Sequence, residues 1–245
     1  MTGASTAAVV VFLATVTAVA VAFLLALRAT MPRRWWLVAL IVVVGWLAIP
    51  GVLARAHLID RYDPLPAPAL IVVAALTFAT TALALSPVGK RFAEGLSLAA
   101  LVGFQVFRVP VEWTLHRLYL DGVVPVQMTY SGRNFDIVSG ATAGLLALWL
   151  ASGQRQWQPV LAWNILGLAL LINIVTIAVL STPVPFRQFT EHAPHRLPST
   201  FPFVWLPTFL VQAALFGHLI VFRALRARKA NPDYQSSAAD LPRAR

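Results

Sequence analysis

The sequence predicts an all-α, polytopic membrane protein with seven transmembrane helices. Three observations predict this class: 59% of the 245 residues are hydrophobic, only 11% are charged, and the mean hydropathy is +0.75. A soluble domain carries about 25% charged residues, so this chain lacks the polar surface that a soluble fold needs. The same composition excludes a disordered chain, a collagen-like chain and a soluble nucleic-acid-binding domain.

Seven apolar segments are separated by short connections. A helix needs about 20 apolar residues to cross the hydrocarbon core, and most of the segments approach or exceed this length. They cover residues 7–27, 35–54, 69–85, 95–120, 136–151, 159–180 and 201–225. We therefore expect a single seven-helix transmembrane domain over residues 1–228. The polar, proline-containing stretch 229–245 is expected to be a disordered cytoplasmic tail.

Lysine and arginine are unequally shared between the two ends of the predicted bundle. With seven spans, six of these residues fall on the side of the N-terminus and twelve on the side of the C-terminus. Basic residues collect in cytoplasmic loops, so we expect the N-terminus outside and the C-terminus inside. No Lys or Arg precedes the first segment, which favours a retained helix over a cleaved signal peptide. The twelve residues are Arg28, Arg33, Arg34, Lys90, Arg91, Arg155, Arg223, Arg226, Arg228, Lys229, Arg243 and Arg245.

Several kinds of chemistry are excluded by what the chain lacks. It has no cysteine, so disulfides, thiolate nucleophiles and Cys-ligated metals are excluded. It also lacks the serine, HExxH and P-loop motifs that would indicate a reaction. The net charge of +10 is explained by cytoplasmic loops beside anionic headgroups. We therefore expect the lipid bilayer as a partner and no nucleic acid, and the sequence does not indicate an oligomeric state.

The fourth segment carries a stripe of polar side chains. They recur at steps of three and four residues, which places them on one helix face. Arg108 lies near mid-membrane, and helix-breaking Pro110 separates it from Glu112. Charges buried in a membrane need partners, so we expect both to face the bundle interior. The partner of each is the other, or a charge from the fifth helix or the outer loops. The stripe consists of Gln105, Arg108, Glu112, His116 and Tyr119.

Two interpretations of this stripe remain open. The pair Arg108 and Glu112 could be a structural staple between helices, or it could belong to a wet cavity that binds a ligand or ion from outside. The turn-rich connection that follows ends at Asn134 and Asp136, at the outer end of the fifth helix. Either residue can cap that helix, whose N-terminus also favours an anion. We include both in the predicted ligand-binding site.

The loop between the sixth and seventh segments contains His192 and His195. A His-x-x-His pair with a nearby carboxylate can bind zinc. Pro194 lies between the two, so a regular helix does not present both on one face. The alternative is a wet loop with ordinary surface histidines. No cofactor is predicted other than a divalent metal at this pair.

Three motifs lie in the second half of the chain: Arg-x-Pro-x-Glu at 108–112, Met-Thr-Tyr-Ser-Gly-Arg-Asn-Phe-Asp-Ile at 128–137 and Pro-Phe-Val-Trp-Leu-Pro at 202–207. In these motifs the chain resembles a family of uncharacterised bacterial multi-pass membrane proteins. The resemblance implies a bacterial inner-membrane protein and carries no activity. It also implies that one shared feature contains Arg108, Glu112, Gly132, Asn134 and Asp136.

Three functions are compatible with these features. The first is the binding or translocation of a small molecule or ion through an outward-facing polar pocket around Arg108 and Glu112. The second is a membrane-embedded enzyme that acts on a lipid or another hydrophobic substrate, with or without a metal. The third is a non-catalytic subunit of a membrane complex. No motif decides whether the protein is an enzyme.

Overall fold

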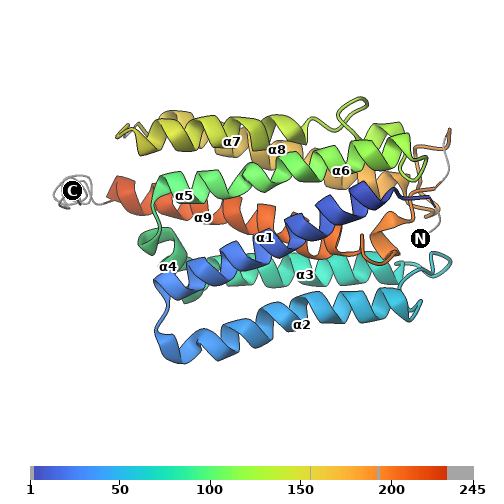
Figure 1. Cartoon of the computed structure of the whole chain (residues 1–245), viewed down its shortest axis with the longest axis horizontal. Coiled ribbons are helices and arrows are strands. Elements are labelled where there is room, and N and C mark those ends of the chain that lie inside the picture. Colours follow the sequence, from blue (N-terminus) through green and yellow to red (C-terminus); the bar gives the residue numbers. More distant parts are fainter. Residues whose placement is uncertain (1–2, 155, 192–193, 231–245) are drawn as a thin grey trace.

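The computed structural model describes residues 3–154, 156–191 and 194–230, and these contain helices and turns but no β-strand. Figure 1 shows the long helices running alongside one another, with α4 at one end of the bundle. The helices are α1 (Thr6–Thr30), α2 (Trp36–Arg55), α3 (Pro68–Leu85), α4 (Pro87–Gly95), α5 (Leu98–Gly103), α6 (Arg108–Leu120), α7 (Asp136–Ala151), α8 (Gln158–Ser181) and α9 (Val211–Ala230).

Six helical segments are long and apolar enough to cross a membrane, so the protein is a helical integral membrane protein. Their bounds agree closely with six of the predicted segments. The remaining segment is α7, which has 16 residues and is therefore about 24 Å long. The six are Thr6–Thr30, Arg33–Arg55, Pro68–Leu85, Leu98–Leu120, Gln158–Ser181 and Leu206–Lys229.

The fourth predicted segment is divided into two α-helices rather than forming one. A 3-10 turn over Phe104–Phe107 separates α5 from α6. Pro110 accounts for this break, because it has no N–H to bond the carbonyl four residues earlier. Residues 87–95 form the separate helix α4, which Ser86 caps by accepting a hydrogen bond from the Val88 amide at 3.1 Å.

The seventh predicted segment begins five residues later than expected. A π-helical turn over Leu206–Leu210 precedes α9. Such a turn leaves carbonyl groups poorly bonded, and two side chains compensate. Gln212 Nε2 donates to the carbonyl of Pro207 at 3.0 Å, and Trp46 Nε1 donates to the carbonyl of Thr208 at 2.7 Å.

Helix α9 lies at the centre of the bundle and α2 at its edge. α9 packs against α3, α4, α5 and α8. In the apolar 18-residue stretch of Leu206–Lys229, 67% of the residues are buried. The corresponding value for α2 is 22%, and Figure 1 shows α2 along one side of the molecule. A helix that is apolar all round and barely buried has lipid as its main neighbour. The buried Asp, Glu and Arg side chains of the described residues are Arg108, Glu112 and Asp136, which lie on α6 and α7.

The connection between α6 and α7 is rich in turns, as expected, and part of it reaches into the protein. Gln127, Met128, Thr129 and Asn134 are buried, whereas Ser131 is exposed. Buried backbone in a membrane protein needs internal hydrogen bonds. Asn134 supplies one by donating from Nδ2 to the carbonyl of Met128 at 3.1 Å. This loop brings the start of α7 into the interior. The predicted disordered tail, 229–245, lies almost wholly outside the described residues.

Candidate functional site

The interior charge pair joins α6 to the first residue of α7. Arg108 and Asp136 are 2% and 5% exposed. The guanidinium binds the carboxylate through two nitrogens: Nε donates to Oδ2 at 2.6 Å, and Nη2 donates to Oδ1. This two-point geometry gives the strongest kind of protein ion pair. The expectation that Arg108 faces the interior and pairs with a charge from the fifth helix agrees with the structure.

The other donors of Arg108 are also used. Nη1 donates to Ser139 Oγ at 2.8 Å and lies 2.8 Å from His218 Nε2, while the carbonyl of Gly167 is 3.4 Å from both Nη1 and Nη2. Arginine has no acceptor, so His218 Nε2 has to accept this hydrogen bond. The proton of the neutral ring then sits on Nδ1, which donates to Asn164 Oδ1 at 2.8 Å. We call this set the Arg108 cluster: Arg108, Asp136, Ser139, Asn164, Gly167 and His218.

Glu112 is buried beside this cluster but uses a different partner. Its Oε2 accepts a hydrogen bond from Asn134 Nδ2 at 2.6 Å, and the ion pair of Arg108 is made with Asp136. Asn134 Oδ1 accepts from the backbone amide of Asp136 at 3.1 Å. Asn134 therefore satisfies the first backbone amide of α7 and holds Glu112 at the same time, although the N-cap position itself is occupied by Phe135.

The predicted polar stripe separates into two groups. Gln105 is buried and donates from Nε2 to the carbonyl of Ala214 at 2.9 Å, so it ties α9 to the 3-10 turn. His116 and Tyr119 do not join the cluster. His116 is half-buried and stacks on Tyr130 with ring centroids 4.4 Å apart, and Tyr119 lies beside it. Arg108 and His116 lie on the same unbroken helix, α6, but they are eight residues apart, which is about 12 Å along the helix axis. His116 and Tyr119 therefore lie too near the C-terminal end of α6 to reach the cluster.

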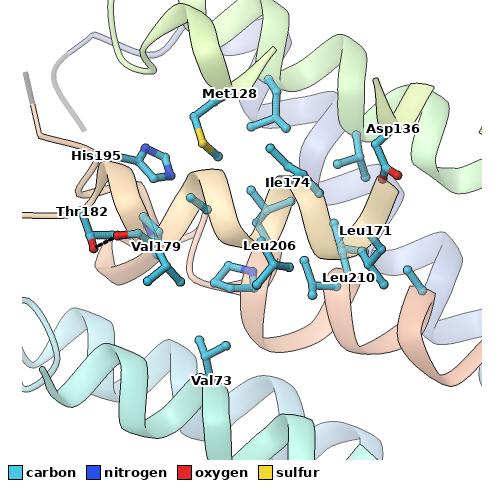
Figure 2. Close-up of a pocket in the computed structure, with 18 of the residues that line it drawn as sticks. Val73, Met128, Asp136, Leu171, Ile174, Val179, Thr182, His195, Leu206 and Leu210 are labelled. Atoms are coloured by element: carbon cyan, nitrogen blue, oxygen red, sulfur yellow. Dashed lines mark hydrogen bonds between the residues drawn. The ribbon is translucent and has the colours of Figure 1, made fainter. Parts of the chain in front are cut away.

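A cavity of about 90 Å³ adjoins the Arg108 cluster. Arg108, Glu112 and Asp136 line it at one side, but most of its wall is apolar, in contrast to the polar pocket that we expected. Figure 2 shows Asp136 and His195 at opposite ends of this wall. The apolar side chains between them come from α8, the π-helical turn and α9, and include Leu171, Ile174, Val179, Leu206 and Leu210.

His195 is the unusual polar residue of the cavity. The side chain is 1% exposed, and neither ring nitrogen has a hydrogen-bond partner in the described part of the chain. Burial lowers the pKa of His195 to about 4, so the ring is neutral at physiological pH. A neutral imidazole offers one donor and one acceptor, and leaving both unbonded costs free energy. A bound molecule with hydrogen-bonding groups would remove that cost.

The metal prediction at the two loop histidines gains no support from the geometry. His192 lies outside the described residues. Among the residues that are described, no three His, Asp or Glu side chains lie close enough together to hold a metal ion. His195 is enclosed by the cavity rather than lying on a wet loop, so the surface alternative is wrong for this residue.

The sequence predicts one site that contains Arg108, Glu112, Asn134 and Asp136, and the structure brings these four together. Three further residues, Ser139, Gly167 and His218, were not predicted to join them. A Cβ at Gly167 would lie 2.6 Å from His218 Cε1 and 2.7 Å from Ser139 Oγ. A glycine within the apolar helix α8 is the signal that could have indicated this contact, because small residues allow neighbouring membrane helices to approach closely.

Comparisons with known proteins give a family but no activity. No curated protein and no solved structure matches the chain. A family model described as a domain of unknown function, DUF8737, matches residues 64–226. This range is the larger part of the chain and contains the whole Arg108 cluster together with Glu112, Asn134 and His195. The protein is therefore a member of the DUF8737 family.

Proposed function

We propose that the protein crosses a bacterial inner membrane seven times, with the N-terminus outside and the C-terminus in the cytoplasm. Besides the six long segments, the short helix α7 supplies one further crossing, the fifth in chain order, and it packs along α5, α6 and α8. Its short length is compensated by the buried loop before it, which carries the chain to the level of Arg108. The twelve-to-six distribution of Lys and Arg supports this orientation. In this topology the His195 end of the cavity lies toward the outside.

Within this topology the protein binds a small, mainly apolar molecule that carries hydrogen-bonding groups. One observation supports this function above others: a cavity with an apolar wall contains a buried imidazole without a partner. Ligand sites are commonly apolar with a few placed polar groups. The binding surface that we propose combines His195, Glu112 and the apolar side chains of α8 and α9.

The Arg108 cluster has a supporting role in this proposal. Each of its charged and polar groups is bonded to another member, so it offers little to a ligand. Its contribution is to fix α6, α7, α8 and α9 around one side of the cavity. Partly exposed residues of α3 and α8, such as Val73 and Val179, also line the cavity, so a ligand dissolved in the bilayer has a route to it.

The experiment compares a variant in which a larger side chain fills the cavity with a control variant that carries the same substitution elsewhere on α8. Ile174 lines the cavity, whereas Ile172 is 59% exposed and faces away from it. Small molecules extracted from the purified protein are identified by mass spectrometry for the parent, Ile174→Trp and Ile172→Trp. We expect a defined molecule in the parent and in Ile172→Trp, and its loss from Ile174→Trp. Equal recovery from all three folded proteins, or from none, would refute the proposal.

A further inference from the structure

A second, larger cavity lies between α1, α2, α3 and α4, far from His195. It has a volume of about 570 Å³ and is formed where the turn after α1 leads into α2. Its deep part is lined by apolar side chains such as Phe23, Val42 and Leu83. Since α2 lies at the edge of the bundle, this space borders lipid (Figure 1). An apolar space beside the bilayer suits a hydrocarbon chain.

The apolar part continues toward the middle of the membrane. A smaller cavity of about 60 Å³ shares Phe23, Val43 and Leu83 with the larger one. At its far side lie Thr80 and Gln212. Both are 3% exposed, and Thr80 Oγ1 and Gln212 Oε1 have no hydrogen-bond partner among the described residues. The two cavities therefore adjoin each other along α2 and α3.

The mouth of the larger cavity is basic and aromatic. Arg28 and Arg33 line it, together with Trp35 and Trp36, and no Asp or Glu does. The described residues include no carboxylate that pairs with either arginine. Tryptophan is the residue typical of the membrane–water interface. The mouth therefore lies at headgroup level, at the end of the bundle that we propose to be cytoplasmic.

We propose that this groove binds one anionic phospholipid. Its phosphate lies at Arg28 and Arg33, and one acyl chain lies in the apolar part between α2 and α3. Arginine guanidinium groups match phosphate oxygens in geometry and charge. Basic pockets between transmembrane helices on the cytoplasmic side commonly hold anionic headgroups. The lipid joins the weakly packed α2 to the bundle, and this site is independent of the His195 cavity.

The first test uses the unmodified protein. Delipidated protein in detergent is given phosphatidylglycerol or phosphatidylcholine with identical acyl chains, and its melting temperature and retained lipid are measured by thermal unfolding and native mass spectrometry. At a lipid concentration about 100 times Kd, we expect phosphatidylglycerol to raise Tm by about 5–10 °C and phosphatidylcholine to raise it much less. Equal shifts with the two lipids would overturn the proposal.

Matched variants locate the site. Arg28→Gln/Arg33→Gln removes the phosphate ligands, whereas Arg34→Gln changes a neighbouring arginine that does not line the cavity. Ala39→Trp blocks the acyl part, and Leu37→Trp changes a 65% exposed residue on the same helix. We expect the phosphatidylglycerol effect to disappear in the double variant and in Ala39→Trp, and to persist in both controls.

Two further outcomes would assign the groove differently. If both groove variants keep the full phosphatidylglycerol effect, the lipid binds elsewhere and the proposal is wrong. If the delipidated parent is a dimer that dissociates in Ala39→Trp and retains no lipid, the groove is an interface with a second copy. The parent comparison of the two lipids stands by itself even if a variant does not fold.

Discussion

His218 and His195 are both imidazoles excluded from water, and their surroundings differ completely. His218 lies in the Arg108 cluster, where Nε2 accepts from Arg108 and Nδ1 donates to Asn164. His195 lies at the far end of the cavity, and neither of its nitrogens has a partner among the described residues. The ring nitrogens of His218 are both hydrogen-bonded within the protein, whereas those of His195 are available to a ligand.

This difference indicates that the Arg108 cluster serves stability and that His195 serves ligand binding. A buried polar group without a partner is costly, so a protein retains one only where something offsets the cost. In the Arg108 cluster the partners are other helices, and the result is a rigid junction of α6, α7, α8 and α9. At His195 the missing partner is, in our proposal, the ligand. Changes in the first region should therefore alter stability at every pH, and changes in the second should alter ligand binding and the pH dependence of stability.

Removal of Asp136 is expected to have the largest effect. Asp136→Ala leaves the Arg108 charge buried without its carboxylate, which should lower the free energy of unfolding by about 3–5 kcal/mol. Replacing both partners, as in Arg108→Met/Asp136→Leu, should restore much of this loss because no unpaired charge remains. Unfolding in detergent by denaturant measures both.

A control for this change is available on the surface. Asp63 pairs with Arg61 at 3.2 Å, and both side chains are exposed. Asp63→Ala should change the free energy of unfolding very little, because exposed ion pairs usually contribute almost nothing to stability. If Asp136→Ala were no more costly than Asp63→Ala, the Arg108 cluster would not be the structural junction that we describe.

The second prediction concerns pH and His195. The folded pKa is about 4, below the ordinary value of 6.5, so the unfolded chain takes up the proton first as pH falls. The free energy of unfolding should therefore decrease between pH 6.5 and pH 4, in total by roughly 3 kcal/mol. His195→Phe should remove this part of the pH dependence, whereas replacement of exposed His57 by Phe should not. Parallel pH profiles for the parent and His195→Phe would contradict the assignment.

The third prediction tests how closely the helices approach at the Arg108 cluster. Gly167→Ala places a Cβ against His218 and Ser139 and should cost about 1–3 kcal/mol through overpacking. Gly45 in α2 has open space around it, so Gly45→Ala should be neutral or stabilising by up to about 1 kcal/mol. In thermal unfolding, Gly167→Ala should lower Tm, whereas Gly45→Ala should leave Tm unchanged or raise it.

The smallest expected effect is the loss of one hydrogen bond to Arg108. Ser139→Ala removes the acceptor at 2.8 Å and should cost about 1 kcal/mol, since interhelical hydrogen bonds in membranes are individually weak. Ser152→Ala, at the exposed end of α7, is the control and should have no measurable effect. A cost for Ser139→Ala as large as that for Asp136→Ala would mean that the hydroxyl, and not the ion pair, dominates the cluster.

The sequence by itself determined where the long apolar helices begin and end. Hydrophobic length is a local property, so the ends of the helical segments agree with the predicted ranges within a few residues, except at the prolines. The burial of Arg108 and Glu112 was also readable, because a charge within an apolar span can only face the interior. Asn134 and Asp136 were readable because they stand at the start of a helix.

Only the tertiary structure decided which groups meet. Arg108 takes its partners 28, 31 and 110 residues away along the chain, and helix spacing alone indicates none of these distances. His116 and Tyr119 lie outside the predicted site because the partners of Arg108 gather around the start of α6, whereas these two residues lie two to three turns farther along the same helix. The cavity, and with it the role of His195, arises from the packing of side chains from α3, α6, α8 and α9. Packing is a property of several helices at once, and no single stretch of sequence contains it.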